Sequence, residues 1–193
     1  ATWRELVLPK YRELTVVSNP LTSSPGMAFL ATTVAAFGEE GFEDFWKQLK
    51  GNGAKVAAGW EEAYFTEFSG SSGNGNYPIV LSYSSSPAAE ISEDGRSQTV
   101  ALLDECFRQI EFVGILAGAK NPVGAKALIE FLLAQPFQST MPGLMYVYPV
   151  NTDATVPEEW STYGPPANST IGGDLDIQSN RSKWQDMWSA IFD

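Results

Sequence analysis

The 193 residues include no histidine and a single cysteine, Cys106. A serine–histidine–aspartate triad, a cysteine–histidine nucleophile pair and a zinc site built on cysteine and histidine are therefore excluded within this chain. A disulfide between two cysteines of the chain is excluded for the same reason. Long apolar runs are also missing, because no window approaches the ~18 consecutive apolar residues that a membrane span requires. The first residues lack the basic and apolar regions of a secretory signal, so we expect no signal peptide in this chain.

Positive charge is scarce. The chain carries 12 basic and 23 acidic side chains, for a net charge of −11. A phosphate backbone would be repelled by such a surface, which predicts that nucleic acid is not a partner. We interpret most of the negative charge as an acidic solvent-exposed surface, although the same field is compatible with a cationic ligand. Hydrophobic residues make up 44% of the chain. This is enough for a core in one large domain or two small lobes.

Short strands alternate with helices along the first half of the chain. Ser24 is expected to cap a helix that has Pro25 in its first turn and Gly38 near its end. Apolar spacing and turn residues predict helices at 3–11, 25–37, 42–53 and 60–68, strands at 14–20, 55–58 and 79–84, and a flexible polar loop at 69–78.

The second half continues this alternation less regularly. It predicts a loop-rich stretch up to residue 104, followed by a long strand at 105–118, a helix at 121–141, a strand at 145–150, a polar segment at 151–178 and a last helix at 182–192. Asn121 is the expected cap of the first of these helices, with Pro122 at its first position. No internal repeat is present. The alternation predicts an α/β fold.

Three hydroxyl groups gather in the turn between the strand at 14–20 and the helix after it, on Thr22, Ser23 and Ser24. Ligands of α/β sheets collect at the carboxyl ends of strands, and free N–H groups at a helix N-terminus favour an anion. Simple capping, worth about 1 kcal/mol, needs only one hydroxyl. From the turn alone, capping and anion binding are about equally supported.

Two further segments place aromatic side chains at strand ends. Trp60 follows a predicted strand, where its ring could lie against an aromatic or cationic ligand, although a Trp packed under the helix is the better interpretation of this residue alone. Tyr83, followed by Ser84 and two more serines, offers a ring and several hydrogen-bond donors. The alternative for this segment is a polar loop that happens to contain a tyrosine.

The segments NPLTSSPG, GWEEAY, VLSYSSSP and MYVYPV occur in this order here. In that order and at similar spacing, they resemble the thiamine-binding proteins of bacterial ABC importers. The resemblance covers nearly the whole chain and is weakest over residues 88–104 and 151–178. It implies an α/β fold of the type II periplasmic-binding class, in which two lobes close on a ligand. It also implies that thiamine or a phosphate ester is captured in the periplasm or at the cell surface, and delivered to an ABC permease without catalysis or a cofactor.

The resemblance assigns roles to individual residues. Thr22, Ser23 and Ser24 stand where family members contact the hydroxyethyl or phosphate end of the ligand. Trp60 and Tyr83, the latter followed by Ser84, match positions of the cage around the ligand rings. Tyr146 stands where better-studied members have a tryptophan, and a tyrosine can still stack there.

Family members also have an N-terminal segment that builds most of a first lobe and that this chain lacks. The resemblance therefore implies that residues 1–105 are mostly second lobe. Residues 106–150 then cross into the first lobe with a strand and a helix, and residues 151–193 return to the second lobe as a tail and a helix. Cys106 is then either a buried small side chain or the partner of a cysteine in the missing segment.

Three other functions stay open. An iron(III)-binding protein of the same class needs adjacent tyrosinates, whereas Tyr83 is followed by serine. An enzyme acting on thiamine phosphates would need paired carboxylates, but Glu61 and Glu62 are neighbours in sequence and do not face each other on a helix. A purely structural interaction module would leave the hydroxyl turn and Trp60 unused.

Overall fold

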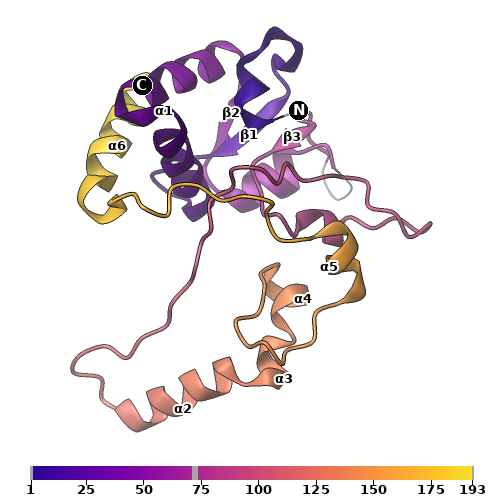
Figure 1. The fold of residues 1–193 in the computed structure, drawn as a ribbon, viewed down its shortest axis with the longest axis vertical. Helices are drawn as coiled ribbons and strands as arrows, with labels where there is room; N and C mark the ends of the chain where they lie inside the picture. Colours follow the sequence, from indigo (N-terminus) through magenta and orange to yellow (C-terminus); the bar gives the residue numbers. More distant parts are fainter. Residues whose placement is uncertain (1, 71–73, 193) are drawn as a thin grey trace.

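The computed structural model describes residues 2–70 and 74–192. It has two regions, which Figure 1 separates clearly. The sheet-bearing body consists of the described residues up to 106 together with residues 169–192, and it holds all three strands and the two longest helices. The helical excursion, residues 107–150, leaves the body as an extended segment and carries three helices below it, and residues 151–168 lead back to the body. No helix among the described residues is long and apolar enough to cross a membrane.

The sheet has three parallel strands in the order β2-β1-β3. β1 spans Thr15–Ser18, β2 Lys55–Ala57 and β3 Ile79–Val80, close to the predicted positions. All four residues of β1 are buried. A parallel strand covered on both faces reads as a continuous apolar run, and this is why "TVV" stands out in the sequence. Because the strands are parallel, their carboxyl ends meet at one edge.

The helices predicted at 25–37 and 42–53 are one element, α1, which spans Ser24–Gly51 and is broken at Gly38. Gly38 has φ 73° and ψ 171°, a backbone conformation that glycine adopts without the steric cost of a side chain. At the other end, Gly26 lies so close to β1 that a Cβ would stand 2.5 Å from the Ser18 carbonyl oxygen. Glycine therefore lets α1 start directly against the end of the central strand.

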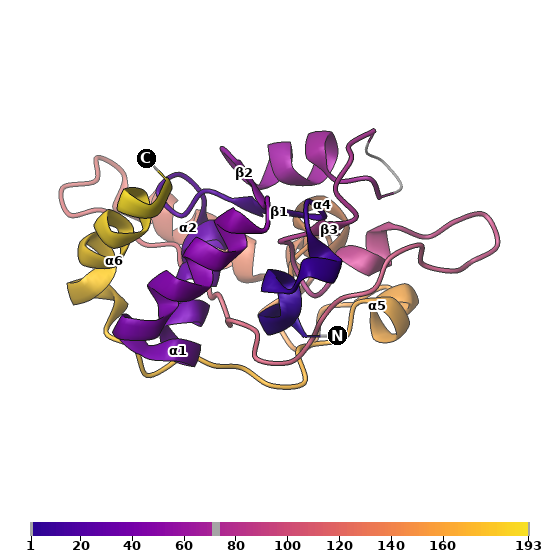
Figure 2. The same cartoon turned by 90° about the horizontal axis from the view of Figure 1, so that it is seen from above.

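The core forms between α1 and α6, the last helix, which spans Ile177–Phe192. Trp46 of α1 is fully buried, and its Nε1 donates to Thr33 Oγ1 at 2.9 Å. The Trp188 and Phe192 rings of α6 meet the Trp46 ring edge-on, with ring centres 5.8 and 6.0 Å away. Figure 2 shows α6 beside α1, with α5 (Glu158–Tyr163) at the opposite end of the molecule. The C-terminal helix thus completes a core that the N-terminal half begins.

The short elements differ in kind from the predictions. The helix expected at 3–11 is two 3₁₀ turns, η1 (Trp3–Val7) and η2 (Pro9–Tyr11), because Leu8 stays extended before proline. The helix expected at 60–68 has a π-helical turn, η3 (Glu62–Glu67), and another 3₁₀ turn, η4, spans Ser86–Ala89. The strand expected at 79–84 pairs only over β3. Part of the loop expected at 69–78 lies outside the described residues.

The long strand predicted at 105–118 is wrong. Cys106 forms one isolated parallel bridge with Thr170, and residues 107–118 join no strand among the described residues. The segment has the apolar side chains of a strand, but a strand also needs a neighbour to take its N–H and C=O groups. Figure 1 shows this segment running alone from the body to α2.

The single helix predicted at 121–141 is also wrong in its extent. It divides into α2 (Pro122–Leu133), α3 (Gln135–Gln138) and α4 (Met141–Met145). The breaks have a cause in the sequence, since Pro136 and Pro142 lack the N–H that a continuing helix requires. The predicted cap is present, and the Asn121 side chain accepts from the Gly124 N–H at 2.9 Å.

Two predictions for the stretch after residue 144 fail as well. The strand expected at 145–150 does not form, because α4 ends in a left-handed residue, Tyr146, at φ 57°. The polar segment expected at 151–178 contains α5, and α6 begins at Ile177 instead of near residue 182. Asp176 explains this earlier start, since its Oδ1 accepts from the Ser179 N–H at 3.1 Å.

Candidate ligand-binding site

The carboxyl edge of the sheet brings two of the predicted segments together. Trp60 follows β2, and Ser82 follows β3 on the other side of the central strand. The Trp60 Nε1 donates to Ser82 Oγ at 2.9 Å, and Ser82 Oγ lies 2.6 Å from Ser86 Oγ. This chain of hydrogen bonds holds the indole ring at the edge of the sheet. Trp60 is half-buried there, so the interpretation of a Trp packed in the core does not hold.

Four other rings surround Trp60. Tyr64 stacks on it, with centres 5.1 Å apart and planes at 23°. Tyr83 and Tyr146 lie tilted against it, with centres at 5.3 and 6.1 Å. Phe65 meets it edge-on at 5.5 Å. The structure therefore brings the Trp60, Tyr83 and Tyr146 rings together, although they are 23 and 63 residues apart along the chain (60 to 83, 83 to 146), and their role in ligand binding stays a prediction.

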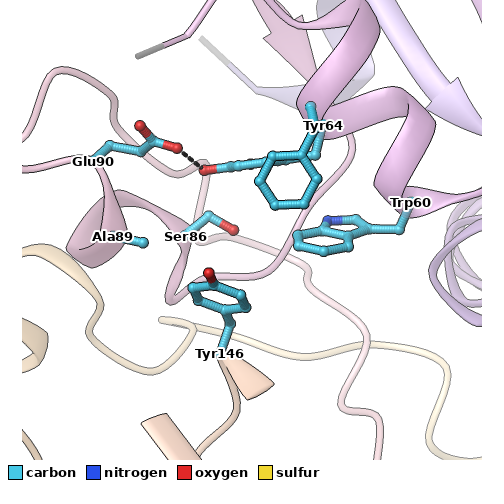
Figure 3. A pocket seen from close by; sticks show the side chains of 7 residues that line it. Trp60, Tyr64, Ser86, Ala89, Glu90 and Tyr146 are labelled. Atoms are coloured by element: carbon cyan, nitrogen blue, oxygen red, sulfur yellow. Dashed lines mark hydrogen bonds between the residues drawn. The ribbon is translucent and has the colours of Figure 1, made fainter. Parts of the chain in front are cut away.

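A cavity of about 130 Å³ opens among these rings. Figure 3 shows its lining residues, which are Trp60, Tyr64, Phe65, Ser86, Ala89, Glu90 and Tyr146. A cavity of about 150 Å³ lined by apolar side chains is known to accept one benzene molecule. The space described here is therefore sized for one aromatic ring.

A buried acid lies at one end of the cavity. The Tyr64 hydroxyl donates to Glu90 Oε1 at 2.5 Å, and each residue is only 4% exposed. Burial, and then the hydrogen bond to Glu90, raises the pKa of Tyr64 above its ordinary value of 10.0. The phenol therefore stays protonated and remains a donor.

Sequence reasoning missed both residues. Tyr64 carried a usable signal, four positions after Trp60 on the same helical face, but Glu90 in its irregular loop carried none.

The hydroxyl turn lies outside this cavity. Thr22 Oγ1 donates to the Ala58 carbonyl oxygen at 2.6 Å, two residues before Trp60. Ser23 is the N-cap of α1, and its Oγ accepts from the Gly26 N–H at 3.4 Å. Ser24 is the first residue of α1, so the predicted cap moves back by one position. Capping is thus present in the structure, and anion binding at this turn stays a prediction.

Of the remaining predicted residues, Tyr146 lines the cavity, whereas Tyr83 and Ser84 do not. Tyr83 contacts the Trp60 ring without lining the space, and burial raises the pKa of its phenol. Ser84 lies against the Tyr148 hydroxyl. Tyr146 belongs to the excursion, and its carbonyl oxygen accepts from Ser85 Oγ at 2.6 Å. The cavity therefore lies where the helical excursion meets the body.

Two further features concern the usual metal ligands and the single cysteine. Over residues 2–70 and 74–192, no three or more His, Cys, Asp and Glu side chains group as metal ligands would. Cys106 is a free, half-buried thiol, and burial, with a smaller effect of Asp104, raises its pKa. Both alternatives for Cys106, a buried small side chain and a disulfide to a cysteine outside this chain, stay predictions.

Comparison with known proteins gives consistent matches. The family model described as bacterial extracellular solute-binding protein matches residues 1–180. The thiamine-binding periplasmic protein of Brucella melitensis is 28% identical over 193 residues, which covers 97% of this chain and 55% of that protein. The corresponding protein of Escherichia coli is 27% identical over 187 residues, covering 96% and 55%. The chain spans about half the length of the curated relatives it matches.

Solved structures match over the whole chain. A periplasmic thiamin binding protein superposes with a TM-score of 0.84 at 24% identity, covering 100% of this chain and 59% of that one. A Bordetella ferric binding protein superposes with a TM-score of 0.56 at 15% identity, covering 99% and 62%. These likenesses confirm the predicted α/β fold of the type II periplasmic-binding class.

Proposed function

Because this chain belongs to the family of bacterial extracellular solute-binding proteins, we propose that it forms the second lobe of a thiamine-binding component of an ABC importer. The protein captures thiamine or a phosphate ester of thiamine in the periplasm or at the cell surface. It delivers the ligand to a membrane permease and makes or breaks no bond. The observation that carries this proposal is the cluster of rings around Trp60 at the carboxyl edge of the sheet.

The chemistry of the site suits such a ligand. Thiamine combines a flat aminopyrimidine ring with a cationic thiazolium ring. Aromatic faces bind flat rings by stacking and attract cations through their quadrupole. Trp60, Tyr83 and Tyr146 supply such faces, and the net charge of −11 favours the approach of a cation. Ser84, on the same loop as Tyr83, belongs to this site in the proposal.

The hydroxyl turn has a separate role in the proposal. Thr22, Ser23 and Ser24 hold the hydroxyethyl or phosphate end of the ligand. Support comes from their place at the N-terminus of α1, a 28-residue helix whose first N–H groups favour negative charge. The Thr22 hydroxyl would exchange its bond to the Ala58 carbonyl for one to the ligand.

We further propose that a first lobe covers the excursion and closes over the cavity. Only Gln138 and Pro142 are buried between residues 107 and 150. Large apolar side chains there are exposed to an unusual degree, among them Phe112 at 91%, Leu116 at 82% and Val123 at 80%. Large apolar side chains exposed in such number are typical of an interface. The relatives are almost twice as long as the region matched here, which leaves room in them for such a lobe.

An iron(III)-binding function is the alternative from the same class, and a Bordetella ferric binding protein shares the fold. Iron(III) would need ionised tyrosines. Burial raises the pKa of Tyr64 and of Tyr83, which works against ionisation. An enzyme acting on thiamine phosphates would release inorganic phosphate from the bound ester, and a phosphate assay during binding would detect this.

Calorimetry tests the proposal on the longest natural polypeptide that contains this chain. We expect thiamine or thiamine monophosphate to bind, and Trp60→Ala to weaken binding by about 1–3 kcal/mol because the stacking face is lost. Trp60→Phe is the matched control, since it keeps a ring at this position and should recover part of the affinity. An unchanged affinity in a folded Trp60→Ala protein would contradict the proposed site. A tyrosinate charge-transfer band on adding iron(III) would favour the alternative.

A further inference from the structure

The Glu90 carboxylate is only half satisfied. Its Oε1 accepts from the Tyr64 hydroxyl, whereas its Oε2 is buried with no hydrogen-bond partner in the described part of the chain. No lysine or arginine among the described residues forms an ion pair with it. Buried polar atoms are nearly always paired in native proteins, and an exception calls for a specific explanation. Glu90 lines the cavity, so a ligand bound there is in a position to supply the missing donor.

The cavity has an aromatic end and a polar end. In Figure 3 the Trp60 ring lies on one side, the Tyr64 hydroxyl points to Glu90 on the other, and the Ser86 and Tyr146 hydroxyl groups lie between them. Its volume of about 130 Å³ matches one ring. The fitting chemical class is therefore a flat heteroaromatic ring that carries a hydrogen-bond donor on its edge.

We infer that Glu90 recognises the exocyclic amino group of the aminopyrimidine ring of the ligand, while Tyr64, held by Glu90, supplies part of the stacking wall. This inference rests on the proposed function. The thiazolium ring is the poorer match for this position, because its quaternary nitrogen has no N–H to give. An amino group donates to the carboxylate, and bonds to a charged acceptor are stronger than bonds between neutral groups.

Oxythiamine provides the test, because an oxo group replaces the pyrimidine amino group of thiamine. Calorimetry with thiamine and oxythiamine is performed on the longest natural polypeptide that contains this chain. We expect the wild type to prefer thiamine by about tenfold or more, since a site built to accept the exocyclic N–H rejects an analogue that presents a carbonyl oxygen at that position. Equal affinities for the two compounds would overturn the inference without any variant.

Glu90→Gln keeps the size of the side chain and removes its charge. We expect its affinity for thiamine to fall about 10- to 100-fold, and its preference over oxythiamine to shrink to about threefold or less. The glutamine amide can donate to the oxo group, so oxythiamine should bind at least as well as to the wild type. Glu93→Gln is the matched control, because Glu93 is exposed on the same loop, and it should keep the wild-type preference.

Tyr64→Phe separates recognition from positioning. It removes the hydroxyl partner but leaves the carboxylate, so the preference for thiamine should survive. If Tyr64→Phe erases the preference as fully as Glu90→Gln, the pair only orients the rings and the inference is overturned. An unchanged preference in Glu90→Gln overturns it too, and leaves the proposed function standing. A wild type that binds neither compound overturns both.

Discussion

The sheet-bearing body and the helical excursion contain similar apolar side chains, but the body buries them and the excursion leaves them exposed. In the body, Phe42 and Trp46 of α1 are completely buried, and α6 covers them. In the excursion, α2 contains no buried residue, and Phe131 is 58% exposed. The difference teaches that an amphipathic pattern predicts a helix and its apolar face, but leaves open which surface covers that face.

The two regions also differ in how they are connected. Within the body, α1 and α6 are joined by ring contacts, a hydrogen bond and an ion pair, between residues more than a hundred positions apart in sequence. The excursion reaches the body at the cavity, through the Tyr146 ring and the Ser85 hydrogen bond. A region held mainly at a binding site is in a position to move with the ligand.

Removal of one large ring from each region should show the greatest contrast. Trp46→Ala should lower the free energy of unfolding by about 3–5 kcal/mol, because a fully buried side chain leaves a cavity. Phe131→Ala in α2 should cost less than about 1 kcal/mol in this 193-residue chain, since its ring already faces solvent. Urea unfolding followed by far-UV circular dichroism measures both. Equal losses would mean that the excursion has a core of its own.

Separation of the chain from its proposed first lobe should have the next largest effect. A submicromolar site represents about 8 kcal/mol or more, and loss of half its contacts leaves binding in the millimolar range. The 193-residue chain should therefore bind thiamine poorly, because Trp60 and the Tyr83 ring beside it belong to one side of the site. Calorimetry of this chain beside the longest natural polypeptide makes the comparison. Submicromolar binding by the short chain would show that it holds a complete site.

The smallest of the expected effects is that of acid, which should weaken the contact between α1 and α6. Glu39 accepts from Lys183 Nζ at 2.5 Å and from Trp184 Nε1 at 2.7 Å. These bonds, the one from Lys183 first, hold the pKa of Glu39 below its ordinary value of 4.5. A lowered folded-state pKa stabilises the fold above about pH 4.5, and this stabilisation is lost as pH falls through the lowered value.

The matched variant for this effect is Glu39→Gln, which cannot ionise. It should unfold with a shallower dependence on pH below 4.5 than the wild type does, as measured by thermal melts across that range. Glu40→Gln is the control on the neighbouring residue and should keep the wild-type dependence. Identical pH profiles for the wild type and Glu39→Gln would mean that the contact contributes nothing to stability.

Much of the body follows from the sequence alone. The helices expected at 42–53 and 182–192 have Phe42, Trp46, Trp184 and Trp188 at helical spacing, and all four are buried. The strand ends next to Trp60 and Tyr83 predicted that these rings meet at one edge of the sheet, because parallel strands must deliver their carboxyl ends to the same edge. These are local properties of the chain, set by the period of each element and by backbone geometry.

Other features depend on parts of the chain that are far apart. The apolar residues 107–118 look like a strand, but only a neighbouring backbone makes a strand, and the described residues offer none. Glu90 has no pattern around it, and its importance comes from burial beside Tyr64 and Trp60. Short-range periodicity records which side of an element is apolar. Strand pairing, side-chain burial and the desolvation of a single carboxylate depend on which distant segments pack against the residues concerned. Only the tertiary structure decides that.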